Sequence, residues 1–133
     1  MFERSGLIRV LYVEDNPSDA DLVFRSLKQG DFGFQLTTVG RVSEALERLD
    51  SQGAPYDLAL IDLLLPDGSG LDVMAAIRSR KLPIAVVLLT GSGTLEAAVA
   101  ALKAGADDYL VKSDDYLELL PSTLNAALVS AAT

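Results

Sequence analysis

The stretch YDLALIDLLLPDGSG, residues Tyr56–Gly70, determines how the rest of the chain is interpreted. Its apolar run Leu58–Ile61 ends on an acid, Asp62, and a turn cluster, Pro66–Gly70, follows after three more apolar residues. This pattern predicts a buried strand that delivers one carboxylate to its carboxyl end before the chain turns into a helix. A buried parallel strand is nearly all apolar, and an unpartnered acid inside it is strongly unfavourable. We therefore expect Asp62 to be either a site residue at the strand tip or a capping acid.

Apolar segments with strand character alternate with segments of helical periodicity along the whole chain. The predicted strands are Leu7–Val13, Phe34–Val39, Leu58–Ile61, Ile84–Leu89 and Asp108–Val111. The predicted helices are Ser18–Gln29, Val42–Leu49, Gly70–Arg80, Thr94–Ala104 and a last helix that begins near Glu118. That start places Pro121 in the first turn, where a missing N–H is tolerated. The alternation indicates an α/β fold, with a parallel sheet covered on both faces by helices.

Composition excludes several classes of function. The chain has 133 residues, typical of one domain, and contains neither cysteine nor histidine. Thiolate chemistry, a histidine triad and a phosphohistidine on this chain are therefore excluded. A net charge of −8 argues against direct binding of nucleic acid, which needs a basic surface. No apolar run approaches the roughly 18 residues of a membrane span, and the first residues lack a secretory pattern, so we expect no membrane association and a cytoplasmic location.

Four of the five predicted strands end on a polar or charged group. Glu14 and Asp15 follow the first strand, Asp62 the third, Thr90 the fourth and Lys112 the fifth. Ligands of open α/β sheets bind at the carboxyl ends of the strands, so these groups are expected to meet. Three carboxylates repel one another, and a hard cation such as Mg²⁺ or Mn²⁺ relieves that repulsion.

A lysine and a hydroxyl beside such a metal suit a phosphoryl group, one as a point charge and the other as a hydrogen-bond donor. A carboxylate can itself be the nucleophile that accepts phosphorus. The strand ends alone therefore predict a metal-assisted aspartyl-phosphate site.

Four motifs at these strand ends together resemble the receiver domain of two-component response regulators. They are VEDN at Val13–Asn16, LIDLLLPDGSG around Asp62, LLTGSG around Thr90, and ALKAGADDYLVKS ending around Lys112. The resemblance covers nearly the whole chain as a single receiver domain, with a core from about Leu7 to Val129. It implies a flavodoxin-like fold of five parallel strands in the order 2-1-3-4-5.

The resemblance also implies roles at the metal and phosphoryl site. Asp62 is the expected phosphoacceptor, and Lys112 the expected partner of the phosphoryl group. Glu14 and Asp15 are expected to hold Mg²⁺ together with Asp62 and the backbone carbonyl of Leu64. The expected donor is a phosphohistidine on a histidine kinase or phosphotransfer protein.

A switch is implied in the same way. Thr90 is the expected switch hydroxyl, and Tyr109 is the switch aromatic that turns inward when Thr90 moves. The output face is then expected on the helix at 94–104, the strand at 108–111 and the last helix. That face is expected to bind a downstream partner or a second copy of the chain.

Two positions depart from the family pattern. Ser113 follows the lysine where the family usually has proline, often with a cis bond, which places the reach of Lys112 in question. A cis bond before a residue other than proline costs about 3 kcal/mol, so a trans or strained loop is expected here. Leu64 is apolar and cannot orient an attacking water by hydrogen bonding, which predicts slow self-dephosphorylation.

Simpler interpretations stand beside these. Glu14 and Asp15 could cap the following helix, Thr90 could be an ordinary polar strand end, and Lys112 a solvated lysine. Asp67 is expected to be a loop or capping residue and not a metal ligand. Two sets of charged residues are expected to be solvated. The first lies at a helix end and consists of Arg78, Arg80 and Lys81. The second lies in loops and consists of Asp107, Asp108, Asp114 and Asp115.

Three other functions remain open at this point. A small hydrolase with an aspartyl nucleophile would need a second acid and a lid, and the chain has no insertion large enough for a lid. A flavodoxin-like flavin binder would need a neutral phosphate loop after the first strand, where Glu14 and Asp15 stand instead. A degenerate receiver that serves only as an interaction module is the third. The complete acid set, Thr90 and Lys112 argue against it, and Ser113 leaves it open.

Overall fold

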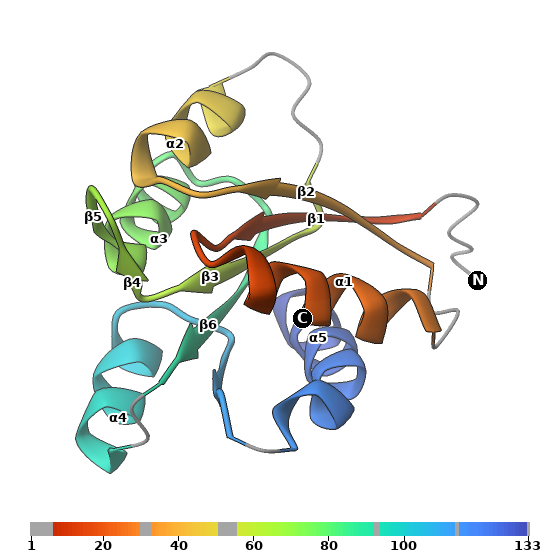
Figure 1. The fold of residues 1–133 in the computed structure, drawn as a ribbon. Coiled ribbons are helices and arrows are strands. Elements are labelled where there is room, and N and C mark those ends of the chain that lie inside the picture. The colour runs from red at the N-terminus through yellow and green to blue at the C-terminus, as the bar shows by residue number, and fades with distance from the viewer. Residues whose placement is uncertain (1–6, 30–32, 51–55, 92–93, 114, 133) are drawn as a thin grey trace.

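Five parallel strands form the central sheet of the computed structural model, which describes residues 7–29, 33–50, 56–91, 94–113 and 115–132 (Figure 1). The strands are β1 (Ile8–Val13), β2 (Phe34–Val39), β3 (Leu58–Asp62), β6 (Ala85–Thr90) and β7 (Asp108–Val111). They pair in the order β2-β1-β3-β6-β7. Since β4 and β5 belong to a separate hairpin, this order confirms the predicted flavodoxin-like arrangement of the five main strands.

Helices cover both faces of the sheet (Figure 1). They are α1 (Pro17–Gln29), α2 (Val42–Asp50), α3 (Gly70–Ser79), α4 (Leu95–Lys103) and α5 (Tyr116–Ala132). Strand residues alternate between the two faces, so that Val10 and Tyr12 pack in the core under α1 and α5. Leu11 and Val13 pack in the opposite core, under α2, α3 and Ala101 of α4. Apart from the start of α5, the predicted bounds of the main elements agree with the structure to within one residue.

A short hairpin replaces the simple turn that was predicted after Asp62. Its strands are β4 (Leu64–Leu65) and β5 (Gly68–Ser69), which pair antiparallel. Gly70 closes the loop, because its N–H donates to the Leu63 carbonyl at 3.0 Å. A Cβ at this glycine would lie 2.3 Å from the carbonyl oxygen of Asp62, a distance that no side chain tolerates. The glycine therefore lets the start of α3 lie directly against the end of β3.

The predicted start of the last helix is wrong by two residues. Helix α5 begins at Tyr116, which places Pro121 inside the helix and not in its first turn. Proline has no N–H to donate to the carbonyl four residues earlier, which here belongs to Leu117. The hydroxyl of Ser26 on α1 donates to that carbonyl instead, at 2.8 Å. A partner from a neighbouring helix thus satisfies the group that the proline leaves open, and this contact is not visible in the local sequence.

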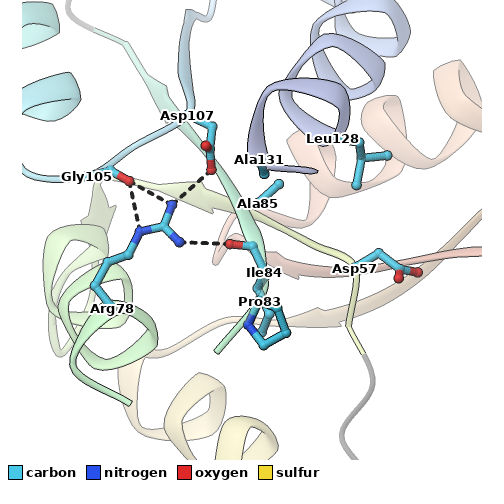
Figure 2. A pocket seen from close by; sticks show the side chains of 9 residues that line it. All are labelled: Asp57, Arg78, Pro83, Ile84, Ala85, Gly105, Asp107, Leu128 and Ala131. Carbon is cyan, nitrogen blue, oxygen red and sulfur yellow. Dashed lines mark hydrogen bonds and ion pairs between the residues drawn. The ribbon is translucent and has the colours of Figure 1, made fainter. Parts of the chain in front are cut away.

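The expectation that Arg78 and Asp107 are solvated is also wrong (Figure 2). Nε and Nη2 of Arg78 donate to the Gly105 carbonyl, and Nη1 donates to the Ile84 carbonyl at 3.0 Å. Nη2 also pairs with Asp107 at 2.9 Å. The same Asp107 carboxylate accepts the N–H of Val86 at 2.8 Å. The pair therefore ties α3 to β6 and to the loop before β7, at the end of the sheet opposite the strand tips.

The other charged residues agree better with expectation. Arg80, Lys81 and Asp115 are exposed, and Arg80 pairs with Asp50 at the surface. Asp108 is half-buried and accepts the N–H of Tyr109, so it is not simply solvated. Asp114 lies outside the described residues. Within the described parts of the chain, no helix is both long and apolar enough to cross a membrane.

Candidate functional site

The carboxyl edge of the sheet brings together the side chains that end four strands. Backbone hydrogen bonds continue the strand pairing at this edge and fix the positions of these residues. The N–H of Glu14 donates to Val39 at 2.8 Å, and the N–H of Lys112 donates to Thr90 at 2.8 Å. Asp62 is the last residue of β3 and pairs with Leu89 of β6. The site thus rests on regular sheet structure and not on a loose loop.

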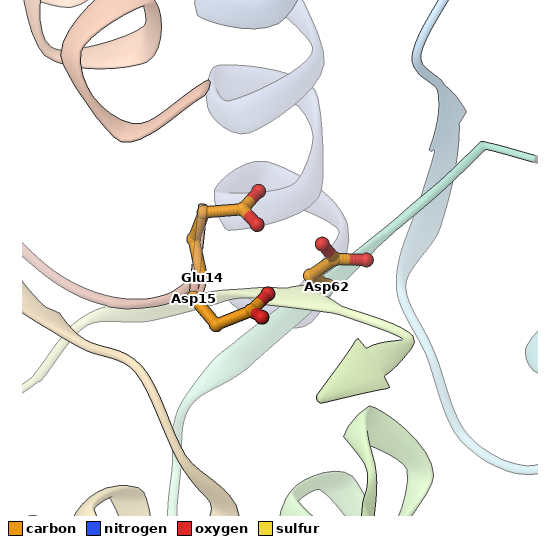
Figure 3. A group of neighbouring side chains, drawn as sticks. All are labelled: Glu14, Asp15 and Asp62. Atoms are coloured by element: carbon orange, nitrogen blue, oxygen red, sulfur yellow. The ribbon is translucent and has the colours of Figure 1, made fainter. Parts of the chain in front are cut away.

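Three carboxylates form a cluster at this edge (Figure 3). Oxygens of Glu14, Asp15 and Asp62 lie within 4.8 Å of one another. Glu14 and Asp62 are buried, with 4% and 7% of their surfaces exposed, whereas Asp15 is exposed. They line an open hollow of about 460 Å³ beside Leu64 and other residues. Hard oxygen ligands with room for water suit Mg²⁺ or Mn²⁺, so the donor set fits the predicted metal.

The pKa of Glu14 is raised to about 7. Burial is the main cause, and a hydrogen bond with Asp62 adds to it, while Lys112 acts in the opposite direction. The cluster therefore holds a proton readily when no cation is bound.

Lys112 joins the cluster from β7. Its Nζ donates to Glu14 Oε1 at 2.6 Å, to Asp62 Oδ2 at 3.0 Å and to Asp19 Oδ2 at 3.0 Å. Burial lowers the pKa of the ammonium, but the hydrogen-bonded carboxylates outweigh this effect and raise the pKa above its ordinary value. Lys112 is therefore a partly buried cation held by three acids and not a solvated lysine.

Asp19 was missed in the sequence analysis. An acid in the first turn of a helix is ordinarily explained by the helix dipole. The position of Asp19 in the sequence could have identified it. Helix α1 begins two residues after Asp15, so its first turn lies at the same edge of the sheet as the acid cluster.

Thr90 and Tyr109 lie on the neighbouring strands β6 and β7. Thr90 ends β6 and is buried, and it pairs with Val111 of β7. Tyr109 is half-buried and packs against the core under α2, α3 and α4. Tyr109 pairs with Leu88 of β6, two positions before Thr90. The role of both residues as a switch stays a prediction.

Comparisons with known proteins agree with this geometry. The model of the response regulator receiver domain matches residues 10–122. The transcriptional regulatory protein CusR of Escherichia coli is 34% identical over 85% of this chain and 48% of its own length. The chain belongs to the receiver domains of response regulators.

Solved receiver structures support the same assignment. A signal receiver domain from Vibrio parahaemolyticus is 30% identical, with a TM-score of 0.83 over 95% of this chain and 93% of the other. The Mn²⁺-bound form of the response regulator Rcp1 is also 30% identical, with a TM-score of 0.75 over 86% and 89% of the two chains. The receiver chain spans about half the length of CusR. Receiver domains are regulatory and bind Mg²⁺ through acidic residues, which sets aside the hydrolase and the flavin binder.

The two departures from the receiver pattern have different consequences. No peptide bond among the described residues is cis, so the Lys112–Ser113 bond is trans. Lys112 nevertheless reaches Asp62, which answers the question that Ser113 raised. Leu64 is 80% exposed at the mouth of the hollow, and its N–H donates to Asp62 Oδ1 at 3.3 Å. Its carbonyl as a metal ligand stays a prediction.

Asp67 of the receiver domain caps a helix, as predicted. Its carboxylate accepts the N–H groups of Val42 at 2.7 Å and Ser43 at 3.0 Å, at the start of α2. These hydrogen bonds, first that from Ser43 and then that from Val42, lower the pKa of Asp67. The hairpin that follows Asp62 is thereby attached to a second helix.

Proposed function

We propose that Asp62 accepts a phosphoryl group from a phosphohistidine on a histidine kinase or phosphotransfer protein. A carboxylate oxygen of Asp62 forms the O–P bond while the P–N bond to the donor imidazole breaks and its electron pair stays on the nitrogen. The contact of Asp62 with both the acid cluster and Lys112 is the observation that carries this proposal. A buried carboxylate that attacks an anionic phosphoryl group needs a cation held by the acid cluster and the charge of Lys112 to offset the repulsion between the two anions.

Glu14, Asp15 and Asp62, with the Leu64 carbonyl, are the residues that would hold Mg²⁺. The hard oxygen donors support this assignment, as does the Mn²⁺ named for Rcp1. When bound, the ion neutralises charge that develops on the phosphoryl oxygens.

Lys112 and Thr90 complete the site on the side of β6 and β7. Lys112 would donate an N–H to a phosphoryl oxygen in place of one of the acids, and the Thr90 hydroxyl would donate to another phosphoryl oxygen. Movement of Thr90 toward the phosphoryl group would let Tyr109 turn inward from β7. The receiver thereby converts a charge at the sheet edge into a change on the surface of α4, β7 and α5.

That surface is the proposed output face. Leu95, Val99 and Leu102 are exposed along α4 at helical spacing and give it an apolar stripe. Such a stripe suits a second copy of the chain or a protein partner. The names of relatives such as CusR point to transcription. For this chain we propose only a protein partner that distinguishes the phosphorylated from the unphosphorylated form of the output face.

The decisive test is intact mass after incubation with acetyl phosphate, with and without Mg²⁺. Wild type should gain one phosphoryl group only with Mg²⁺, and Asp62→Asn should gain none. Asp21→Asn is the matched control, because it removes an acid of α1 that pairs with Arg25 away from the cluster. A wild type that gains no mass would instead identify a degenerate receiver that acts as an interaction module.

A further inference from the structure

The ammonium of Lys112 has no donor to spare. An ammonium carries three N–H groups, and in this structure each has a carboxylate partner, on Glu14, Asp19 and Asp62. Only 14% of the Lys112 side chain is exposed, so these carboxylates supply most of the polar surroundings of the ammonium. The position of the ammonium therefore depends on which of these acids remains available to it.

The three acids differ in what else they do. Glu14 and Asp62 belong to the acid cluster that would hold a cation, and Asp62 is also the proposed phosphoacceptor. When a cation or a phosphoryl group is bound, Glu14 and Asp62 would turn oxygens toward it and away from Lys112. Asp19 stands outside the cluster found among the described residues. It is the one partner of Lys112 whose carboxylate has no second function in the reaction.

Helix α1 holds the backbone of Asp19 in place. The side chain of Asn16 caps the helix, accepting the N–H of Ser18 at 2.9 Å and that of Asp19 at 3.2 Å. Because Asn16 supplies the cap, the carboxylate of Asp19 is not needed there. It is free to turn toward Lys112 while its backbone stays fixed.

The same helix also holds the segment just after Lys112. Ser26 of α1 donates to the carbonyl of Leu117, in the first turn of α5. Asp19 and Ser26 thus contact the chain on both sides of the loop in which Ser113 replaces the usual proline. These contacts with α1 restrain both sides of the loop, in addition to the hydrogen bond from the Ser113 hydroxyl to Asp115.

We propose that Asp19 is a positioning residue that keeps the Lys112 ammonium at the phosphoryl site while Glu14 and Asp62 are engaged elsewhere. This inference rests on the proposed function of Asp62 and names a further residue on which that function depends. The opposite effect is the competing explanation. If Asp19 acted only as a negative charge beside the site, it would repel an anionic phosphodonor, and its removal would accelerate phosphorylation.

A double-mutant cycle with acetyl phosphate and saturating Mg²⁺ separates these effects. Asp19→Asn should slow phosphorylation about three- to tenfold when Lys112 is present and have no further effect in a Lys112→Gln background. Asp21→Asn, with the same charge change on the same helix, should leave the rate unchanged, and Asp19→Glu should restore part of it. A faster or unchanged rate in Asp19→Asn, or equal slowing in both backgrounds, would overturn the proposal.

A second measurement needs no phosphoryl transfer. In protein labelled with ¹⁵N-lysine, a held ammonium exchanges its protons slowly and gives an NMR signal, which the Lys112→Gln variant assigns by its absence. This signal should persist with Mg²⁺ in wild type and in Asp21→Asn and disappear in Asp19→Asn. Its loss in wild type on adding Mg²⁺, or its survival in Asp19→Asn, would refute the role of Asp19. If wild type is not phosphorylated, the function of Asp62 fails while this measurement still decides on Asp19.

Discussion

Leu64 is the residue that we expect to control the lifetime of the phosphoryl group. It lies exposed at the mouth of the hollow, two residues after Asp62, and presents only methyl groups to any water that approaches. Leu64→Asn should shorten the phosphoryl lifetime severalfold, because an amide can orient the attacking water. The decay of phosphorylated protein after removal of acetyl phosphate measures this. Leu71→Asn, at an exposed leucine of α3, is the control, and equal lifetimes for Leu64→Asn and wild type would contradict the prediction.

Glu14 makes the stability of the metal-free protein depend on pH. Its folded pKa of about 7 lies above the ordinary value of 4.5, so unfolding releases a proton between these values. The free energy of unfolding should therefore fall as pH rises from 4.5 to 7, by up to about 3 kcal/mol. Urea unfolding with a chelator measures this fall, and Glu14→Gln should lack it. Equal pH dependence of the two proteins in this window would count against the assignment, whereas Mg²⁺ should reduce the fall in wild type.

At the scale of elements, α1 and α5 are joined by the contact that Pro121 makes necessary. Ser26→Ala should lower the free energy of unfolding by about 1–2 kcal/mol, because the Leu117 carbonyl then has no donor in the helix. Urea unfolding measures the change. Ser122→Ala, which removes an exposed hydroxyl bonded to its own helix, should change stability by less than about 0.5 kcal/mol.

The reverse substitution sharpens this test. Pro121→Ala supplies an N–H that can reach the Leu117 carbonyl, so Ser26→Ala should have a smaller effect in that background. Equal effects of Ser26→Ala in both backgrounds would show that the hydroxyl acts through something other than the open carbonyl.

The elements themselves were predictable because their signals are local. Apolar runs that end on Asp62, Thr90 and Lys112 contain both the strand and the site residue within a few positions. The contacts that were missed join distant positions instead: Arg78 with Asp107, and Ser26 with Leu117. Periodicity reports which face of an element is apolar, but it cannot report which polar group another element will present. Charged side chains were therefore assigned to solvent where they in fact connect elements.

At the scale of the whole molecule, the two ends of the sheet have different tasks. The carboxyl edge carries the acids and Lys112, whereas Arg78 and Asp107 tie elements together at the opposite end. Thr90 and Val111 are paired at the ends of β6 and β7, so we expect a shift of Thr90 to act first on β7 and the helices beside it.

Phosphorylation should therefore alter hydrogen exchange mainly on α4, β7 and the start of α5. We expect amides of residues 95–103 and 108–111 to change their exchange rates in wild type with acetyl phosphate and Mg²⁺, and those of β2 to stay constant. Thr90→Ala should still gain the phosphoryl group but lose most of this change, because the hydroxyl that transmits it is absent. Identical exchange on this face with and without phosphorylation would eliminate it as the output surface. A change that survives in Thr90→Ala would instead mean that the acyl phosphate reaches α4 by another route, through the loop that follows β6.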